Sequence, residues 1–219
     1  MPACKAGREL IVRQLGLSDY AETWQKMRSM TELRNHESSD ELWLLEHPRV
    51  FTLGQAGRTE HVLDAGKIPV IGSDRGGQVT YHGPGQLVAY VLMDLRRRGL
   101  GVRQLVDGLE QCVIDILAAA GVCGERRPRA PGVYVSGAKV CALGLRIRNG
   151  CSYHGMALNV NMDLEPFQRI DPCGYAELPV TRLSDLAIPW DVDEAGRRLL
   201  AAFVRQFGYR AHRDLETTA

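Results

Sequence analysis

The sequence lacks the long hydrophobic runs and the charge bias that indicate membrane proteins or general nucleic-acid binders. Among 219 residues, the best candidate for a membrane span, Val113 to Val122, is too short and contains Asp115. The formal net charge is only +1 at pH 7, so a strongly basic binding surface is not expected. The segment up to Glu9 has no apolar stretch of the kind found in signal peptides. We therefore expect a cytoplasmic protein that binds neither nucleic acid nor membranes.

Motifs for metal and nucleotide binding are also missing. The cysteines include no C-x-x-C pair, and no histidine pair completes a zinc site. The spacing and the lysine of a Walker A loop are absent, as is a dinucleotide-binding glycine pattern. In a reducing compartment, cysteines stay free thiols and most are small core residues. We therefore expect no metal, no cofactor and six free thiols, at Cys4, Cys112, Cys123, Cys141, Cys151 and Cys173.

Lysine is rare in this chain, which has four lysines against 23 arginines. One of the four, Lys139, begins an otherwise apolar strand from Val140 to Leu145, where a charged side chain is unusual. A partly buried lysine can lose its proton, whereas arginine stays charged, so lysine suits chemistry that moves protons. A lysine at the strand edge that reaches solvent is the plainer alternative, and the strand alone does not decide between the two.

Hydrophobic periodicity predicts an α+β fold, with a mixed, mainly antiparallel central sheet flanked by helices. Short turns between consecutive strand-like runs, at Gly137 and at Asn149-Gly150, indicate antiparallel hairpins. Because no linker or repeat interrupts the chain, we expect a single domain over residues 1–219. Strands are expected at residues 8–15, 41–46, 50–53, 87–94, 132–135, 139–148 and 152–161.

Three helices are expected beside these strands. Ser18 can cap the first, and the second carries its apolar face between Leu105 and Ala120. The third begins with a capping-box pattern at Asp191 and stops at Gly208. The residues from about His212 onward are expected to be loose, as chain ends often are.

The segment from Arg75 to Gln86 combines four glycines with many polar side chains. Glycine lets the backbone come close to a ligand, although a glycine-rich segment is more often a turn than a site. The density of hydrogen-bonding side chains favours a binding loop in this case. These side chains are Arg75, Gln78, Thr80, Tyr81 and His82.

Cys173 lies between Pro172 and Gly174, and so in a turn rather than in an apolar strand or helix. A turn can expose a thiol, and a nearby cation is needed to keep that thiol ionised at neutral pH. Lys139 is the obvious cation, although a structural turn cysteine explains the local pattern equally well. His154, within a strand-like run, is more often a structural residue than a catalyst.

Four segments of the chain, taken together, resemble one family, the octanoyltransferases of lipoate biosynthesis, also called lipoyl(octanoyl) transferases. The segments follow the family's order, and the resemblance runs from about residue 36 to residue 211. The glycine segment is highly specific, and four matching segments in order make coincidence a poor explanation. The segments are Arg75–Gln86, Gly137–Ile147, His154–Asn161 and Asp171–Gly174.

This resemblance implies the fold of the catalytic module of biotin and lipoate protein ligases, and an acyltransferase that needs no ATP. Such enzymes transfer an octanoyl (or lipoyl) group from octanoyl-acyl carrier protein to a protein lysine. The implied acceptors are the lipoyl domains of 2-oxoacid dehydrogenase E2 subunits and the glycine-cleavage H protein. We expect the chain to act as a monomer.

The resemblance also implies roles for individual residues. The cysteine of the Pro-Cys-Gly turn, here Cys173, carries the acyl thioester, and the strand lysine, here Lys139, lowers the pKa of that thiol. Asp171 stands where the family pattern suggests asparagine, and its charge would raise the pKa of a nearby thiol. The acyl chain is expected to contact Arg75, Gly76, Gly77, Gln78, Val79, Thr80, Tyr81, His82, Ala142, Leu143, Gly144, Gly155, Met156 and Ala157.

Three other functions stay open at this point. An ATP-dependent lipoate- or biotin-type protein ligase would make an acyl-adenylate, and a thioesterase would transfer the acyl group to water. A non-catalytic protein that binds lipoyl domains would show no turnover. Arginines at 96–98 and at 126–129 are candidates for contact with an acidic carrier protein, although exposed arginines are usually only solvated.

Overall fold

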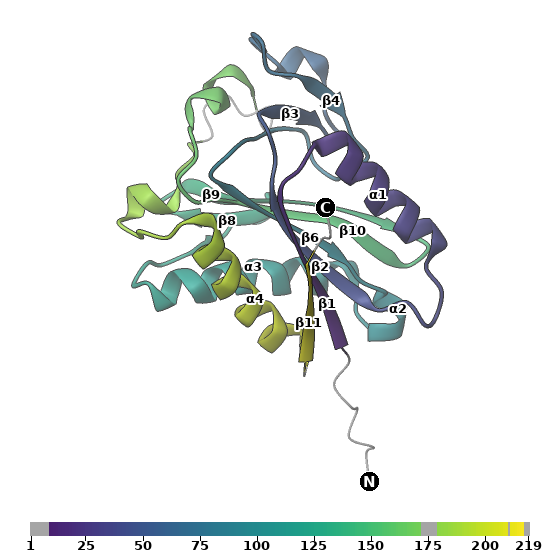
Figure 1. Cartoon of the computed structure of the whole chain (residues 1–219). Coiled ribbons are helices and arrows are strands. Elements are labelled where there is room, and N and C mark those ends of the chain that lie inside the picture. Colours follow the sequence, from purple (N-terminus) through teal and green to yellow (C-terminus); the bar gives the residue numbers. More distant parts are fainter. Residues whose placement is uncertain (1–8, 172–178, 210, 217–219) are drawn as a thin grey trace.

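A computed structural model describes residues 9–171, 179–209 and 211–216 (Figure 1). In this part of the chain the main sheet has eight strands, in the order β11-β1-β2-β6-β10-β9-β8-β7. β1 pairs in parallel with β2 and β11, and every other neighbouring pair is antiparallel. The prediction of a mixed, mainly antiparallel sheet is therefore confirmed. The strands are β1 (Glu9–Leu17), β2 (Asp40–Glu46), β6 (Gln86–Leu92), β7 (Glu125–Arg126), β8 (Gly132–Val135), β9 (Ala138–Arg148), β10 (Cys151–Asn159) and β11 (Ala211–Glu216).

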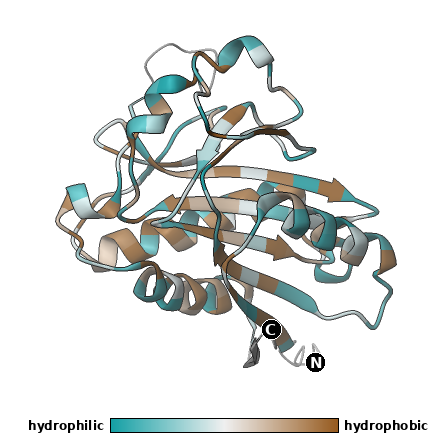
Figure 2. Cartoon of the chain, turned by 45° about the horizontal axis from the view of Figure 1, so that its top comes forward, coloured by the Kyte–Doolittle hydropathy of each residue, from teal (hydrophilic) through white to brown (hydrophobic). Residues whose placement is uncertain are grey.

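Helices cover both faces of this sheet (Figure 1). On one face, Leu109 and Phe203 belong to a large apolar cluster with sheet residues, and Met27 packs into a second cluster on the other face. Figure 2 shows hydrophobic strand residues between helices that carry hydrophilic outer surfaces. Within the described residues, no helix has the length and apolar character that a membrane span requires. The helices are α1 (Tyr20–Leu33) on one side, α3 (Val102–Ala119) and α4 (Val192–Phe207) on the other, and the short α2 (Leu95–Arg98).

A smaller sheet, with three strands among the described residues, lies above the face that carries α1 (Figure 1). β3 (Val50–Leu53) is its central strand, and Phe51 and Tyr81 are buried in its own apolar core. The glycine segment therefore contains a strand, β5 (Val79–His82), which the glycines and polar residues around it conceal in the sequence. The other elements are β4 (Val70–Gly72) and the 3-10 turns η1 (Thr59–His61), η2 (Glu165–Arg169) and η3 (Leu183–Leu186).

The two turns on either side of β9 have the geometry that their sequence predicts. Ser136 and Gly137 have φ values of 46° and 87°, and Asn149 and Gly150 have values of 51° and 75°. Positive φ at both central residues is the mark of a type I′ turn, whose twist matches that of a hairpin. These turns fix the register of β8, β9 and β10, and with it the residues that stand opposite each other in the cavity described below.

Two predicted details at the ends of elements are wrong. Asp19, not Ser18, caps α1, because its Oδ1 accepts a hydrogen bond from the amide of Glu22 (3.0 Å). The hydroxyl of Ser18 instead donates to the carbonyl of Leu15 (2.8 Å). The residues from His212 onward are not loose up to residue 216, because β11 forms a parallel ladder with β1. Such pairing depends on a strand about 200 residues away, which local sequence does not reveal.

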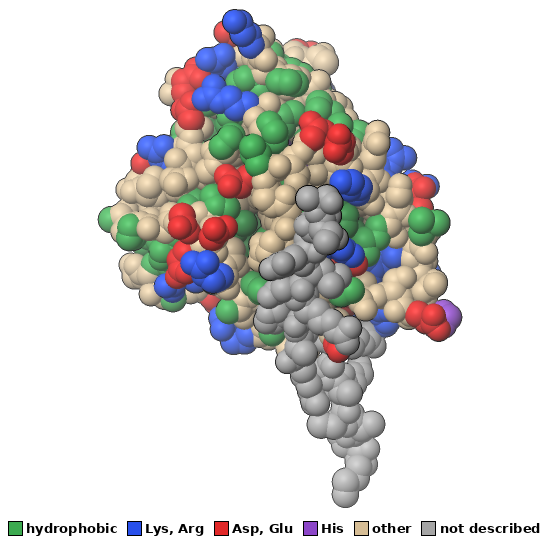
Figure 3. All heavy atoms as spheres, in the orientation of Figure 1, with side chains coloured by type: hydrophobic (Ala, Val, Ile, Leu, Met, Phe, Trp, Pro, Cys, Tyr) green, Lys and Arg blue, Asp and Glu red, His purple; other side chains and the backbone are tan. Residues whose placement is uncertain are grey.

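Charged side chains of both signs lie side by side on the surface shown in Figure 3, in keeping with the small net charge. One carboxylate, Asp40, is instead buried and joins three parts of the chain. Its Oδ1 accepts from Arg34 (3.1 Å) and Arg97 (2.7 Å), and its Oδ2 accepts from the hydroxyl of Tyr209 (3.0 Å). Asp40 therefore ties the start of β2 to the ends of α1, α2 and α4.

Candidate active site

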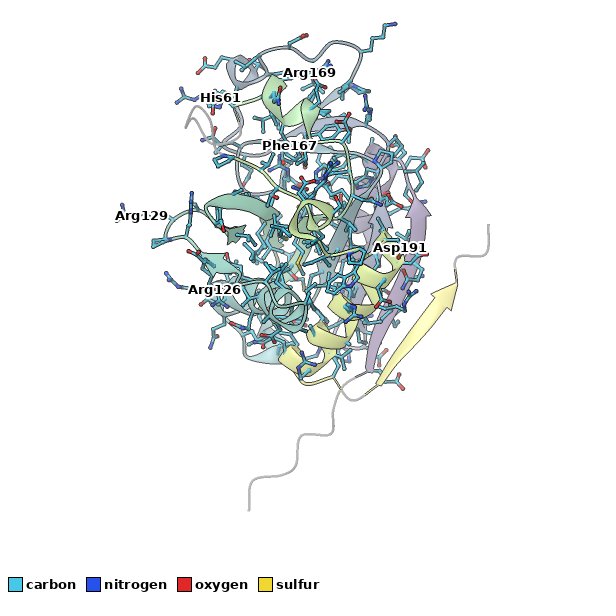
Figure 4. All side chains as sticks on the ribbon, turned by 90° about the vertical axis from the view of Figure 1, so that its left-hand side faces the viewer. His61, Arg126, Arg129, Phe167, Arg169 and Asp191 are labelled. Carbon is cyan, nitrogen blue, oxygen red and sulfur yellow. The ribbon has the colours of Figure 1, made fainter. Side chains whose placement is uncertain are left out.

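A cavity of about 1130 Å³ lies between the main sheet and the smaller sheet. Its exposed lining residues, which form the mouth, include loop 127–129, Gly77 and Pro179. Among its buried lining residues, Tyr90 and Gly155 lie on β6 and β10, and Tyr20 and His82 lie on α1 and β5. The cavity therefore extends from the β8–β9 side of the sheet inward across β10 to β6. Figure 4 shows Arg129 projecting outward, below the segments that carry Phe167 and His61.

Small residues on two adjacent strands form the floor of the cavity. In the ladder between β9 and β10, Gly144 stands opposite Gly155 and Ala142 opposite Ala157. Two pairs of small residues in consecutive positions on one face leave room above the sheet that larger side chains would fill. Gly155 has a second reason to be glycine, because a Cβ there would collide with the carbonyl oxygen of Ala89.

Arg75 fixes the glycine segment that forms the roof. Its Nη2 donates to the carbonyls of Thr52 (2.6 Å) and Gln78 (2.7 Å). Its Nη1 donates to the carbonyl of Gly76 (2.9 Å), and its Nε to Oγ1 of Thr52 (3.0 Å). The amide of Gly76 in turn donates to the carbonyl of Leu145 on β9 (2.9 Å). The buried guanidinium thus holds the loop backbone in place over the sheet.

The structure brings most of the predicted acyl-binding residues to this one cavity. Gly76 and Tyr81 are the two that do not line it. Gly76 is engaged with Leu145, and the ring of Tyr81 packs among Phe51 (5.5 Å between centroids) and Phe167 (5.6 Å). The predicted residues that line the cavity are Arg75, Gly77, Gln78, Val79, Thr80, His82, Ala142, Leu143, Gly144, Gly155, Met156 and Ala157.

Lys139 lies half-buried near the mouth of the cavity. Its Nζ is 5.2 Å from the centre of the Tyr134 ring, a cation–π distance. Its amide donates to the carbonyl of Pro179 (2.8 Å), and its carbonyl accepts from the amide of Thr181 (2.9 Å). The chain just after residue 178 is therefore attached to the strand position that carries Lys139.

Cys173 lies outside the described residues, in the gap from 172 to 178. The residue before the gap, Asp171, donates its amide to the carbonyl of His61 (2.8 Å), and one of its carboxylate oxygens, Oδ1, is buried without a hydrogen-bond partner among the described residues. Asp171 thus joins η1 at one end of the gap, while Pro179 joins β9 at the other. Whether Lys139 contacts the Cys173 thiol stays a prediction.

The described cysteines are poor nucleophiles for the most part. Burial raises the pKa of Cys112 to about 12, and burial likewise raises the pKa of Cys141 to about 12. Burial also raises the pKa of Cys151. A thiol with a raised pKa is almost entirely protonated at neutral pH and reacts slowly. Cys123 is exposed, and it is not among the residues that line the cavity.

A cluster of rings that no sequence pattern indicated lies at the inner end of the cavity. His47 lies at its centre, with ring centroids 5.2 Å from Tyr20, 5.8 Å from His82 and 5.8 Å from Tyr90. Burial lowers the pKa of His47 to about 4 and holds the pKa of His82 well below its ordinary value. Both imidazoles are therefore neutral at pH 7. Tyr20, His82 and Tyr90 come from separate parts of the chain, and His47 from the break between two predicted strands. The sequence therefore carried no signal that they meet.

His154 completes this cluster from β10. Its ring centroid is 5.9 Å from that of Tyr90, and its Nε2 is 2.9 Å from Oδ1 of Asp74. Burial lowers the pKa of His154, so the neutral ring donates its Nε2 proton to that carboxylate. Burial opposes ionisation of Asp74, but hydrogen bonds from His154, Tyr153 and Trp24 outweigh it and lower its pKa. Nδ1 of His154 has no hydrogen-bond partner among the described residues.

Comparison with known proteins agrees with this architecture. The sequence model of the family described as lipoyl protein ligase A/B catalytic domain matches residues 19–204. The octanoyltransferase of Stutzerimonas stutzeri (strain A1501) is 59% identical over 204 residues, which are 93% of this chain and 93% of that protein. The octanoyltransferase of Xylella fastidiosa (strain 9a5c) is 57% identical over 206 residues, which are 94% of this chain and 90% of that protein.

Two solved structures show the same fold at low sequence identity. A structure from work on a bipartite lipoate protein ligase and its E2 lipoyl domain from Thermoplasma acidophilum has a TM-score of 0.74 and 17% identity, and the match covers 97% of this chain and 87% of that one. The biotin protein ligase of Aquifex aeolicus, in complex with biotin and ATP, has a TM-score of 0.56 and 15% identity, and the match covers 91% of this chain and 70% of that one.

The fold is that of the lipoate and biotin protein ligases. The chain belongs to the lipoyl protein ligase A/B catalytic domain family and, within it, to the octanoyltransferases, which are acyltransferases. The resemblance drawn from the four sequence segments is therefore confirmed.

Proposed function

We propose that this acyltransferase moves an octanoyl group from acyl carrier protein to a lysine of a lipoyl domain, through a thioester on Cys173. The observation that carries the proposal is the position of Lys139. This lysine borders the apolar cavity, and its backbone holds the chain that follows the Cys173 segment. A lysine and a cavity with an apolar floor thus lie together among the described residues, and the proposal adds the Cys173 thiol to them.

The chemistry follows from the donor, which is already an activated thioester. The thiolate of Cys173 attacks the acyl carbonyl, a new C–S bond forms, and the bond to the pantetheine sulfur breaks. The pantetheine thiolate takes up a proton and leaves with the carrier protein. The amine of the acceptor lysine then attacks the acyl-Cys173 carbonyl, loses a proton and forms an amide, and the Cys173 thiolate is released. No step consumes ATP, because one thioester replaces another and the amide is the more stable product.

Lys139 has two proposed roles in this sequence. As an ammonium, it stabilises the Cys173 thiolate and so raises the fraction that can attack. In the second step, its neutral form accepts a proton from the incoming amine. A lysine can do both, whereas an arginine cannot give up its proton in the physiological range. This explains why a chain that otherwise prefers arginine has a lysine here.

The cavity would hold the acyl chain by burying its methylene groups. At about 0.8 kcal/mol for each CH₂, burial of an octanoyl chain stabilises the complex by roughly 5 kcal/mol. The pairs of small residues, Gly144 with Gly155 and Ala142 with Ala157, leave the space for it. The same residues would also satisfy sheet packing alone, so the acyl-binding role of this floor remains part of the proposal.

The two arginine groups named in the sequence analysis lie in different places. Arg127 and Arg129 border the mouth, so an acidic carrier protein that docks there would meet them. Arg96 lies against Gly150, at the opposite end of the β9–β10 hairpin from Lys139. We therefore assign carrier contact to the 126–129 group only. The same proposal places the enzyme in the cytoplasm, where carrier protein and 2-oxoacid dehydrogenases meet.

Intact-mass spectrometry after mixing with octanoyl-acyl carrier protein tests the proposal. We expect one adduct of octanoyl mass on the wild-type chain and none on Cys173→Ala. Cys123→Ala is the matched control, because Cys123 is the exposed cysteine of the described residues and should be dispensable. An adduct that persists in Cys173→Ala, or none on any variant, would contradict the proposal. Turnover that requires ATP would indicate a ligase instead.

A further inference from the structure

The inner end of the cavity is a wall of four aromatic or imidazole rings, here called the ring wall: Tyr20, His82, Tyr90 and His154. All four line the cavity, and each is at most 5% exposed. Tyr20 and His82 stack with their planes 15° apart at 5.8 Å, and Tyr90 meets His154 edge-on at 5.9 Å. The wall therefore consists of rings in contact with each other, contributed by α1, β5, β6 and β10.

Most polar atoms of the ring wall are engaged with other protein groups, and Nδ1 of His154 is the exception, with no partner among the described residues. The Tyr20 hydroxyl donates to Oγ of Ser73 (2.7 Å), and the Tyr90 hydroxyl donates to Nε2 of His47 (2.7 Å). Nδ1 of His82 is 2.7 Å from the side-chain oxygen of Gln86, and Nε2 of His154 bonds to Asp74 as described. With these bonds made, the wall offers mainly ring carbon to a ligand. It is suited to an apolar methyl end rather than to a polar head.

The ring wall is held firmly in its position. His154 has a φ of 59°, a left-handed conformation that is uncommon for a non-glycine residue inside a strand. Such a conformation persists only where the surroundings hold it, here through Asp74 and the stacked ring of Tyr153 (5.0 Å). Behind the wall, His47 is fully buried and donates its Nδ1 proton to the carbonyl of Ser18 (2.6 Å). A ligand that presses on these rings meets packed protein.

The ring wall lies across the sheet from Gly144. Tyr90 stands opposite Gly155, and Gly155 stands opposite Gly144, so the step from β9 to β6 at this level is two strand spacings, or about 10 Å. An extended octanoyl chain measures roughly 9 Å, because its C–C bonds of about 1.5 Å form a zigzag. A chain that crosses β10 from a point beside Gly144 therefore ends at the ring wall, while Lys139 lies five residues further along β9, toward the mouth.

We propose that the ring wall selects the length of the acyl chain by limiting how far the chain can enter, with Tyr20 and Tyr90 as its specificity-determining residues. This inference rests on the proposed acyl transfer. A shorter chain leaves methylene-sized gaps and forfeits burial, about fourfold in affinity for each missing methylene. A longer chain must displace rings whose hydrogen bonds hold them in place. Preference thus falls on both sides of the matching length.

A competition experiment measures this preference within one sample. The enzyme is mixed with equal amounts of hexanoyl, octanoyl, decanoyl and dodecanoyl carrier protein, and the four adducts are counted by intact mass. We expect octanoyl to dominate in the wild type. In Tyr20→Val and Tyr90→Val, the ratio of dodecanoyl to octanoyl adduct should rise at least tenfold. Because only a ratio is read, a partial loss of folded protein does not affect the result.

Two further variants separate the size of the ring from its hydrogen bond. Tyr20→Phe keeps the ring and loses only the bond to Ser73, so its adduct profile should stay that of the wild type. Val88→Phe adds volume in front of the wall and should shift the preference toward hexanoyl. Unchanged profiles in Tyr20→Val, Tyr90→Val and Val88→Phe, with octanoyl adduct still formed, would show that the ring wall does not select the chain length. Absence of every adduct from the wild type would instead refute the proposed function.

Discussion

Lys139 and Val180 form an isolated parallel β-bridge, in which two backbone segments pair at a single position. The bridge uses both backbone groups of Lys139, which bond to the residues on either side of Val180. It fixes the strand that bears the lysine to the end of the segment that bears Cys173. The side chain of Lys139 is left to act as a cation at the mouth.

The first prediction concerns the charge of Lys139. In Lys139→Ala, the pH midpoint for alkylation of Cys173 should move up by roughly one to three pH units, because a nearby cation is lost. Lys67→Ala removes an exposed lysine and should leave the midpoint unchanged. Iodoacetamide labelling against pH, followed by peptide mass mapping, measures both. The same midpoint in all three proteins would show that Lys139 does not affect the pKa of the Cys173 thiol.

A second prediction follows from the close approach of the roof to the floor. A Cβ on Gly144 would lie 2.7 Å from the carbonyl oxygen of Gly76. Gly144→Ala should push the roof away, slow adduct formation at least tenfold and destabilise the fold by about 1–3 kcal/mol. Gly196→Ala in α4 meets only ordinary contacts, at 3.7 Å and beyond, and should stabilise by about 0.5–1 kcal/mol. Urea titration and adduct rates report both effects, and a full rate in Gly144→Ala would refute the argument.

The third prediction uses the lowered pKa of His47. Between pH 6.5 and about 4 the unfolded chain binds a proton that the folded chain excludes, so stability falls as pH decreases. From pH 7 to pH 5 this one residue should cost about 2 kcal/mol of unfolding free energy. His47→Gln should reduce the pH dependence, to which the lowered pKa values of His82 and His154 also contribute, while His36→Gln, on the surface, should leave it as it is. Urea unfolding at several pH values gives the slope, and equal slopes in wild type and His47→Gln would contradict the assignment.

A fourth prediction tests the buried carboxylate of Asp40. Asp40→Asn keeps the shape of the side chain but leaves Arg34 and Arg97 without their shared anion. Breaking a buried ion pair from one side costs about 3–5 kcal/mol, so a loss in that range is expected. Asp193→Asn, on the exposed face of α4, should change stability by less than about 0.5 kcal/mol. A fall of less than 1 kcal/mol in Asp40→Asn, seen by chemical denaturation, would show that the two arginines find other partners.

Local patterns were enough to predict much of the sheet. The strands β3 and β8 have the predicted bounds, and both hairpin turns next to β9 were identified from Gly137 and Asn149-Gly150. These features depend on neighbours in sequence, through alternation and through the positive φ that glycine and asparagine tolerate. β5 was missed because the glycines and polar residues around it indicate a loop, and β11 because its partner lies at the other end of the chain.

The candidate site also has one part that the sequence indicates and another part that only the fold reveals. The glycine segment and Lys139 stand out in the sequence through composition alone. The ring wall does not, because Tyr20, Tyr90 and His154 are ordinary residues of a helix and two strands, and only the order of the strands brings them together. Tyr81 shows the opposite case, since it belongs to a conspicuous segment but points into the small sheet's own core.

The position of the cavity mouth affects how the two protein partners can bind. Loop 127–129, Lys139 and Pro179 border the same opening, which leads to the inner wall. In the proposed reaction, carrier protein and lipoyl domain must use this opening in turn, because neither can reach the sulfur while the other occupies it. Steady-state data should then give parallel double-reciprocal lines, with each protein inhibiting at high concentration. The rate of lipoylation in the cell would depend on the ratio of donor to acceptor as well as on the amount of either.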